Sequence, residues 1–368
     1  MCRSLTDARL TTLRALLDEH ALDAMLISRT ANKRFFSGFR LSVADGPTSG
    51  FAGTLIVTRD ANLILVDTRY TEQAANEAPG WQVVSTAGPM HEEVPPLLLR
   101  HEIGALGMEA AVVTHADWAA LAEAAPGVEL HAMDDELVPL RIFKTPDEVE
   151  AIGRACSLTD ACFAHLAEFV RVGMTEREVA LELERYFRTN GAESLAFEPI
   201  VLAGARAAMP HGRPSDAVIE RGNVLLIDFG CTVDGYRSDM TRTVFMGDVP
   251  DHIRRYHGAV REAQQAAIDA VAIGVNGQEL DAIARHRIEA EGVEPYGHGL
   301  GHGIGLETHE PPRLRKSEAF TLEAGMVFSI EPGIYLPGVT GVRIEDIVAL
   351  EAPGPRLLTT SPREALVV

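Results

Sequence analysis

Cysteine, positive charge and long apolar runs are all scarce in this sequence. Its 368 residues include 4 cysteines, and no two of them form a Cys-x-x-Cys pair. A disulfide framework or a zinc ribbon is therefore not expected, and we interpret the thiols as reduced and mostly structural. No stretch approaches the roughly 18 consecutive apolar residues of a transmembrane helix, so a membrane-spanning segment is not expected either.

The charge balance and the missing motifs exclude further classes of protein. The formal net charge of −20 disfavours binding to the phosphate backbone of nucleic acids. Apolar residues make up 46% and charged residues 23%, a composition typical of a globular chain. Residues 1–10 lack the apolar region of a secretory signal, so the expected location is the cytoplasm. The catalytic and nucleotide-binding motifs HExxH, GxSxG and GxxxxGKS/T are absent.

The length favours two domains, and the local pattern changes near residue 143. Before this point helical and strand patterns alternate, which predicts an α/β domain. The expected elements are a helix at 5–20, a strand at 24–27, a hairpin of strands at 53–58 and 62–66, a helix at 70–77 and a strand near 81–85.

The second domain is expected to begin at 144 with the start of a long helix. Thr145 followed by Pro146 has the pattern of an N-cap with proline at the first helical position. Thr175 with Glu178 has the pattern of a capping box, which predicts a helix over about 175–190. Strands then dominate 194–246, helices are expected at 250–273 and 277–291, and strands and glycine-rich loops follow from 294.

The first chemical motif is a pair of acids around a hairpin turn. Asp228 ends an apolar strand, and the dipeptide 234–235 is Asp-Gly, a strong signal for a two-residue turn. With that turn Asp239 lies opposite Gly230, so Asp228 and Asp239 are diagonal neighbours on one face, roughly 7–8 Å apart. Their carboxylates could then bind one cation. A three-residue turn would place them on opposite faces, and the alternative interpretation is two solvated acids near a turn.

The second motif is a glycine-rich segment with three histidines. His298, His302 and His309 lie within twelve residues, among glycines that let other groups approach the backbone closely. Neutral imidazole is a common ligand of divalent metals and a proton carrier near neutral pH. A single histidine is more often structural, but three in one such segment favour a functional site.

Two further segments place a glutamate in an apolar strand pattern. Glu331 lies in the segment 325–333, and Glu345 lies in 341–348. A carboxylate in such a place is costly unless it is paired or bound to a metal ion. A salt bridge to Arg343 is the alternative explanation.

These motifs together offer four carboxylates and one imidazole. An oxygen-rich set suits two hard or borderline dications, such as Mn²⁺ or Co²⁺, better than a thiolate zinc site. Four negative charges balance two dications, so a bridging hydroxide could bind and act as a nucleophile on a carbonyl. The residues of this five-ligand set are Asp228, Asp239, His302, Glu331 and Glu345.

The five-ligand set resembles that of the pita-bread metallopeptidases, the family of methionine aminopeptidase, aminopeptidase P and prolidase. Creatinase shares their fold without the metals. The segments 32–38 and 66–70 resemble the N-terminal domain of the proline-specific members. The resemblance implies an α/β (α+β) fold class with two domains: a creatinase-like α/β domain at 1–143, for dimerisation and substrate access, and a catalytic pita-bread domain at 144–368. That second domain is expected to be a curved antiparallel sheet backed by helices.

The resemblance also implies a role for each matching residue. Asp228 would bind one metal ion, Asp239 and Glu345 would bridge both, and His302 and Glu331 would hold the other. Glu331 would also transfer a proton. The remaining implied roles are His298 and His309 near the substrate and in proton traffic, His211 in positioning substrate, Arg313 or its rival Arg315 on the substrate carboxylate, Arg343 in orienting carboxylates, and Tyr236 beside the metals.

The implied activity is hydrolysis of the peptide bond before proline, with two divalent ions, Mn first and Co or Zn as alternatives. A dipeptidase needs a cation for the substrate carboxylate, so Arg313 and Arg315 favour an Xaa-Pro dipeptidase (prolidase) over aminopeptidase P, which acts on Xaa-Pro-Yaa and longer peptides. Methionine aminopeptidase usually lacks such an N-terminal domain. A metal-free creatinase-like hydrolase or a non-catalytic binding protein is a further alternative, against which the complete ligand set argues.

The expected partners are a proline-containing peptide substrate and a second copy of the chain, with no nucleic acid or membrane. The loop 37–51, with Arg40 and Asp45, is a candidate to reach an active site, either its own or that of a second subunit. We therefore include Arg40 among the candidate substrate-binding residues. A solvated surface loop is the alternative.

Overall fold

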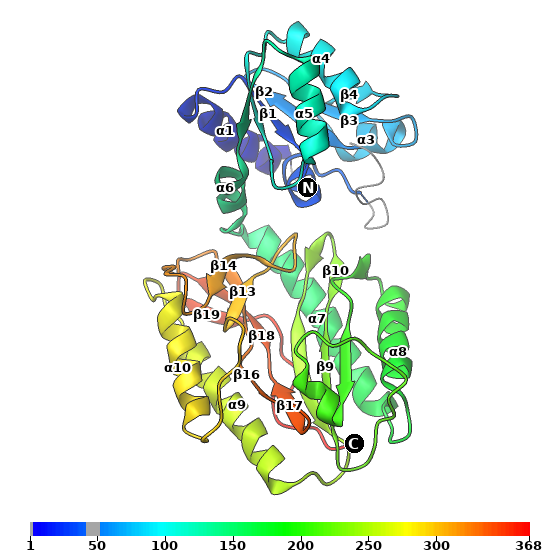
Figure 1. Cartoon of the computed structure of the whole chain (residues 1–368), viewed down its shortest axis with the longest axis vertical. Coiled ribbons are helices and arrows are strands. Elements are labelled where there is room, and N and C mark those ends of the chain that lie inside the picture. The colour runs from blue at the N-terminus through cyan, green and yellow to red at the C-terminus, as the bar shows by residue number, and fades with distance from the viewer. Residues whose placement is uncertain (1–2, 42–51) are drawn as a thin grey trace. The chain divides into compact units, whose positions relative to one another are not determined.

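The computed structural model describes residues 3–41 and 52–368, which form two compact units, Met1–Leu140 and Arg141–Val368 (Figure 1). The division lies three residues before the boundary expected at 143/144. None of the helices in the described part of the chain is both long and apolar enough to cross a membrane.

The N-terminal unit is built on a six-stranded mixed sheet in the order β4-β3-β2-β1-β5-β6. The central strand β1 pairs antiparallel with β2 and parallel with β5. All four residues of β1 are buried, as its unbroken apolar sequence predicts. The elements are α1 Arg3–Glu19, β1 Ala24–Ile27, α2 Thr30–Ser37, β2 Thr54–Thr58, β3 Asn62–Val66, α3 Thr71–Glu77, β4 Gln82–Ser85, α4 Met90–Arg100, β5 Ala105–Met108, α5 His115–Ala124, β6 Glu129–Ala132, α6 Asp134–Leu137 and the 3₁₀ helix η3 Val138–Arg141.

The C-terminal unit consists of antiparallel strands and four long helices. Its sheets have the orders β12-β9-β8, β11-β10-β7, β14-β13-β15-β18-β19 and β16-β17. The helices are α7 Pro146–Phe169, α8 Glu176–Thr189, α9 Asp251–Asp269, α10 Gly277–Glu289 and the 3₁₀ helix η4 Gly204–Ala208. The strands are β7 Ser194–Leu195, β8 Ile200–Ala203, β9 Val224–Phe229, β10 Cys231–Val233, β11 Tyr236–Arg237, β12 Met240–Phe245, β13 Gly301–Gly303, β14 Glu310–Leu314, β15 Val327–Ile330, β16 Gly333–Leu336, β17 Thr340–Arg343, β18 Asp346–Glu351 and β19 Gly354–Leu357.

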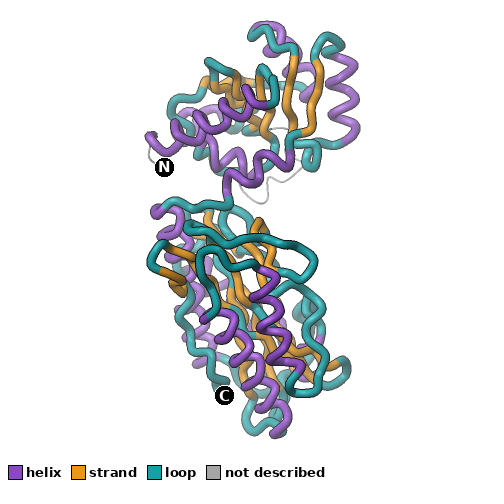
Figure 2. The backbone as a smooth tube through the Cα atoms, turned by 90° about the vertical axis from the view of Figure 1, so that its left-hand side faces the viewer, coloured by secondary structure: helices purple, strands orange, loops and turns teal. Residues whose placement is uncertain are grey.

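Each pair of helices in this unit covers its own set of strands. Helices α7 and α8 share an apolar core with β8, β9 and β12, and α9 and α10 share another with β15, β17 and β18. Viewed from the α9 and α10 side, these two helices lie in front of the strands (Figure 2). The capping box expected at Thr175 and Glu178 is formed at α8, and the N-cap expected at Thr145 is formed at α7, where Glu148 completes a capping box that the sequence analysis did not predict. The expected α/β class and the sheet backed by helices are confirmed.

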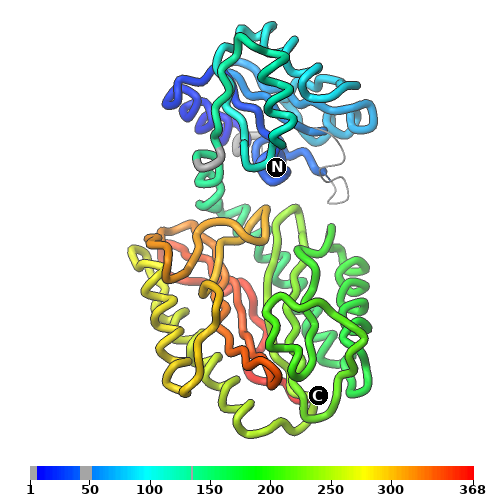
Figure 3. The backbone as a smooth tube through the Cα atoms, in the orientation of Figure 1, coloured from blue at the N-terminus to red at the C-terminus, as the bar shows by residue number. Residues whose placement is uncertain are grey.

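Strands β12 and β17 join the two halves, although about 100 residues separate them in the sequence. The Thr243 hydroxyl donates to the carbonyl of Arg343 at 3.0 Å, and the Glu345 N–H donates to the carbonyl of Thr241 at 3.1 Å. The C-terminal end also returns to β12, where Phe245 forms a bridge with Val367. Figure 3 shows this red C-terminal segment beside the green strands.

The long hairpin of β9–β10 and β11–β12 has the expected two-residue turn, between β10 and β11. Asp234 and Gly235 have φ angles of 51° and 80°, the left-handed conformation that this turn requires. Val233 pairs with Tyr236, and Asp228 pairs with Thr241, so the same register holds on both sides of Gly230. Asp228 and Asp239 therefore lie on one face of the hairpin as diagonal neighbours, as the sequence predicts.

Replacing Gly230 by alanine tests how tightly this hairpin is closed. A Cβ atom at Gly230 would lie 1.9 Å from the Ser238 carbonyl oxygen, so the two strands would have to separate. We expect Gly230→Ala to lower the free energy of unfolding by about 3 kcal/mol. In the control, Gly153→Ala, the new Cβ meets no atom within 4 Å and lies in helix α7, so stability should stay equal or rise by about 1 kcal/mol. Calorimetric melting of both variants measures the difference, and equal melting temperatures would contradict this account.

Candidate metal centre

All five residues of the expected ligand set line one cavity of about 440 Å³ in the C-terminal unit. Each of them lies on a strand or at its end. Asp228 belongs to β9, and Asp239 immediately precedes β12. His302 lies in β13, Glu331 directly follows β15, and Glu345 lies between β17 and β18. The fold thus brings together side chains that are spread over 118 positions of the sequence, from 228 to 345.

Three buried carboxylates at this cavity each leave one oxygen unused. Asp228 Oδ1, Asp239 Oδ1 and Glu345 Oε1 are buried and accept no hydrogen bond from any residue that the structure describes. The second oxygen of Asp228 accepts from Arg343 at 2.5 Å, and that of Glu345 accepts from the Thr241 hydroxyl at 2.7 Å. Ligand atoms of Asp239, Glu345 and His302 all lie within 4.8 Å of one another. Unpartnered oxygens at this spacing are what a bound cation requires.

The electrostatics of the carboxylates support the same interpretation. Burial, together with the charges of Glu345 and Asp228, raises the pKa of Asp239 well above its usual value. Burial and the charges of Glu331 and Asp228 do the same to the pKa of Glu345. Arg343 only partly offsets the effect of burial on Asp228, whose pKa is also raised. Buried carboxylates this crowded need further positive charge, and oxygen donors with one imidazole fit hard or borderline divalent ions.

His302 and Glu331 form the other side of the cluster. The Nδ1 atom of His302 lies 3.1 Å from the Gly303 carbonyl, which can only accept, so Nδ1 carries a proton. Its Nε2 atom therefore points into the site, 3.3 Å from Glu331 Oε1 and 3.7 Å from Asp239 Oδ2. Although burial opposes it, hydrogen bonding to His302 lowers the pKa of Glu331 to about 2. The hydrogen bond to Glu331 uses a proton on Nε2, and a cation that displaced this proton would meet Nε2 as a ligand atom already oriented through Nδ1.

A second chain of contacts connects Asp228 to His298. Arg343 donates to Asp228, to the Thr241 hydroxyl at 2.9 Å and to the Tyr335 hydroxyl at 2.8 Å. His298 Nδ1 lies 2.7 Å from the Gly299 carbonyl, so Nε2 is the acceptor for the Tyr335 hydroxyl at 3.0 Å. Burial raises the pKa of Tyr335 to about 12, which keeps this donor protonated.

Sequence reasoning missed Tyr335 and Thr241. Neither stands in a motif that signals chemistry, and both reach the site only because β16 and β12 lie beside it. Tyr236, which the resemblance placed beside the metals, instead donates its hydroxyl to Glu148 Oε1 at 2.8 Å and is not among the residues that line the cavity. Tyr335 does not line the cavity either, but its hydroxyl bonds to Arg343 and His298, which do.

The other predicted residues occupy different places. His211, His309, Arg313 and Arg315 all line the cavity. The rings of His309 and His302 are 4.3 Å apart, and partial burial with the charge of His302 lowers the pKa of His309 to about 4. Arg313 lies opposite His302 in the backbone pairing of β14 with β13. The Arg315 guanidinium forms an ion pair with Glu318 at 2.7 Å.

Arg40 belongs to the N-terminal unit. Its backbone N–H donates to Glu77 at 2.8 Å, and its carbonyl accepts from Gln73 at 2.7 Å. Asp45 lies outside the described residues. A role for Arg40 in substrate binding stays a prediction.

Comparisons with known proteins agree with this arrangement. Residues 150–352 match the model of metallopeptidase family M24, and residues 9–143 match that of the creatinase/prolidase N-terminal domain. The Xaa-Pro dipeptidase of Pyrococcus furiosus is 37% identical over 97% of this chain and 99% of its own length.

Two solved structures are similar over almost the whole chain. The Xaa-Pro dipeptidase from Bacillus anthracis has a TM-score of 0.92 at 35% identity, covering 99% of this chain and 100% of that one. The X-Pro aminopeptidase from Thermotoga maritima has a TM-score of 0.89 at 36% identity, covering 98% and 99%. The protein therefore belongs to metallopeptidase family M24, with a creatinase/prolidase N-terminal domain.

Proposed function

We propose that the protein is a dinuclear metal-dependent Xaa-Pro dipeptidase, which hydrolyses the peptide bond before proline. The observation that carries the proposal is the set of three buried, unpartnered carboxylate oxygens, on Asp228, Asp239 and Glu345. Their position beside His302 and Glu331 in one cavity supports the proposal of a site for cations. The names of the similar proteins from Pyrococcus furiosus and Bacillus anthracis support the choice of substrate.

The residues proposed to hold the two ions are those of the five-ligand set. Asp239 and Glu345 are the proposed bridges, as the family resemblance implies, and their ligand atoms lie within 4.8 Å of each other and of His302. Mn²⁺ is the proposed metal, with Co²⁺ and Zn²⁺ as alternatives. When bound, the two ions would polarise the scissile carbonyl and lower the pKa of a water molecule.

The protein's own residues have three tasks in this proposal. Arg343 and Thr241 each occupy one carboxylate oxygen, of Asp228 and Glu345, and so direct the other oxygen into the cavity. Glu331, ionised at neutral pH, is the proposed group that accepts the proton of the attacking water and passes it to the leaving nitrogen. His298, His309 and His211 are proposed to position the substrate, the first two as neutral imidazoles because their pKa values are lowered.

The dipeptidase assignment depends on a cation for the substrate carboxylate. Arg313 lines the cavity and is the preferred candidate, because Arg315 is already paired with Glu318. Aminopeptidase P remains the alternative, and the similar structure from Thermotoga maritima bears an aminopeptidase name. The homodimer, the cytoplasmic location and the role of Arg40 stay predictions.

Hydrolysis assays with two substrates test the proposed function. The protein is treated with a chelator, reconstituted with Mn²⁺, and given an Xaa-Pro dipeptide and an Xaa-Pro-Yaa tripeptide in parallel. We expect cleavage of the dipeptide alone. Cleavage of the tripeptide would instead identify an aminopeptidase P, and metal binding without cleavage of either peptide would refute the specificity for proline.

Glu345→Gln should have opposite effects on the metal-free and the metal-loaded protein. Removing one of several crowded charges relieves repulsion, so the metal-free variant should melt at or above the temperature of the metal-free wild type. With Mn²⁺ at about 1,000 times its Kd the wild type should gain about 4 kcal/mol, and the variant should lose most of this gain. Activity should fall more than about 100-fold, with a lower metal content.

The control for this variant is Glu351→Gln, at the far end of β18, the strand that directly follows Glu345. Glu351 is partly exposed and pairs with Arg356 at 2.9 Å, away from the site. Its metal content and activity should match those of the wild type. Normal metal content and full activity in Glu345→Gln would contradict the proposed ligand set.

Arg313→Gln tests the recognition of the substrate carboxylate. Loss of a hydrogen-bonded charge pair should raise KM for an Xaa-Pro dipeptide by about tenfold or more and leave kcat nearly unchanged. The corresponding Xaa-Pro amide, which has no carboxylate, should be cleaved equally by variant and wild type. Arg315→Gln serves as the matched control, and a larger KM effect in that variant would move the role to Arg315.

A further inference from the structure

Arg242 lies on the opposite face of β12 from the cavity, and all of its donors are used. Its neighbour Thr241 points toward Glu345, and successive side chains of a strand point to opposite faces. A guanidinium has five N–H groups, and each of those of Arg242 has its own acceptor. The acceptors are the carbonyls of Thr241 at 2.9 Å, Glu345 at 2.6 Å, Ser361 at 2.7 Å and Pro362 at 2.9 Å, and the Asp346 carboxylate at 2.6 Å.

Glu345 is held at three points by two consecutive residues of β12. Its N–H donates to the Thr241 carbonyl, and its Oε2 accepts from the Thr241 hydroxyl. Its own carbonyl accepts from Arg242. With the backbone and one carboxylate oxygen fixed, Oε1 is the single polar atom of this residue that has no partner among the described residues.

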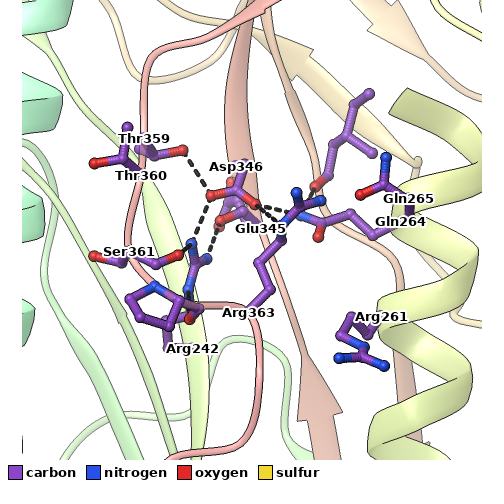
Figure 4. Close-up of polar contacts among 12 residues, drawn as sticks. Arg242, Arg261, Gln264, Gln265, Glu345, Asp346, Thr359, Thr360, Ser361 and Arg363 are labelled. Carbon is purple, nitrogen blue, oxygen red and sulfur yellow. Dashed lines mark hydrogen bonds and ion pairs between the residues drawn. The ribbon is translucent and has the colours of Figure 1, made fainter. Parts of the chain in front are cut away.

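Asp346 extends the same network toward Glu331. Its Oδ1 accepts from Arg242 and from the Thr359 hydroxyl at 2.7 Å, and its Oδ2 accepts from Gln264 at 3.0 Å. Gln264 also donates to the carbonyl of Ile330, the residue before Glu331, at 3.1 Å. Figure 4 shows Arg242 and Asp346 lying between Glu345 and the segment with Thr359 and Ser361. One buried cluster therefore fixes the backbone beside two of the proposed metal ligands.

We infer that Arg242 is a positioning residue of the metal centre, which holds Glu345 in place through its main-chain carbonyl and through Asp346. The inference rests on the proposed function, in which Glu345 bridges the two ions. A ligand must be held to within about half an ångström of its place, and partners behind the ligands provide this precision. A salt bridge that merely stabilised the fold would not need to contact Glu345.

Arg242→Lys is the direct test of this role. Lysine keeps the positive charge opposite Asp346, but its three donors share one nitrogen and cannot reach acceptors in the three segments that Arg242 connects. The metal-free variant is titrated with Mn²⁺ by calorimetry, and the spin coupling of the bound ions is recorded by electron paramagnetic resonance. We expect Kd to rise about 10–100-fold and the coupled two-ion signal to weaken.

Two arginines of the same region serve as matched controls. Arg363 lies 3.7 Å from Asp346 without contacting Glu345, and Arg261 forms an exposed pair with Glu364 at 3.0 Å. Arg363→Gln and Arg261→Gln should leave both Kd and the coupled signal within about twofold of the wild type. A Kd in Arg363→Gln as high as in Arg242→Lys would overturn the inference, because it would show that any loss of an interaction with Asp346 weakens Mn²⁺ binding, without a contact to Glu345.

The outcomes separate positioning from simple stabilisation. If Arg242→Lys melts at a lower temperature but its folded form binds Mn²⁺ with wild-type Kd and coupling, Arg242 is structural and the inference is wrong. If it does not fold, Thr359→Val provides the test, because it removes the hydrogen bond to Asp346 and the acceptor of the Ile347 N–H, and leaves every charge in place. That variant should raise Kd severalfold, and an unchanged Kd would overturn the inference. A wild type that binds no metal would instead refute the proposed function.

Discussion

The crowding of buried carboxylates at the end of a hairpin is the constraint on which the rest of the site depends. Asp228, Asp239 and Glu345 are each nearly inaccessible to water, and each keeps one oxygen without a donor. Burying several like charges together costs free energy unless positive charge is supplied at the same place. Arg343 supplies it to Asp228, and divalent ions are the proposed source for the remaining oxygens.

The surrounding fold explains how such a costly arrangement persists. The carboxylates lie on strands or directly beside them, and hydrogen bonds between these strands hold their backbones in place. Thr241 and Arg242 hold Glu345 from the two faces of β12, and Gln264 on helix α9 donates to Ile330, the last residue of β15, directly before Glu331. The same connections join the two halves of the C-terminal unit, so the contacts that organise the site also stabilise its fold.

Local signals in the sequence predicted much of this architecture. The Asp-Gly turn at 234–235 predicted the register that places Asp228 beside Asp239. The N-cap pattern at Thr145 and the capping box at Thr175 correctly located the starts of α7 and α8. The contacts of Tyr335, Thr241 and Arg242 could not be predicted in this way, because they join segments up to about 120 residues apart. The hydrogen bond that the Tyr236 hydroxyl donates to Glu148 of helix α7 could not be predicted for the same reason.

The central claim is that the unpartnered carboxylate oxygens are ligand atoms. It is tested most directly by an anomalous difference map from crystals of the Mn²⁺-loaded protein. The account predicts two neighbouring peaks within coordination distance of Asp228 Oδ1, Asp239 Oδ1 and Glu345 Oε1. A map with no peak there, or with ions that contact none of these three oxygens, would contradict it.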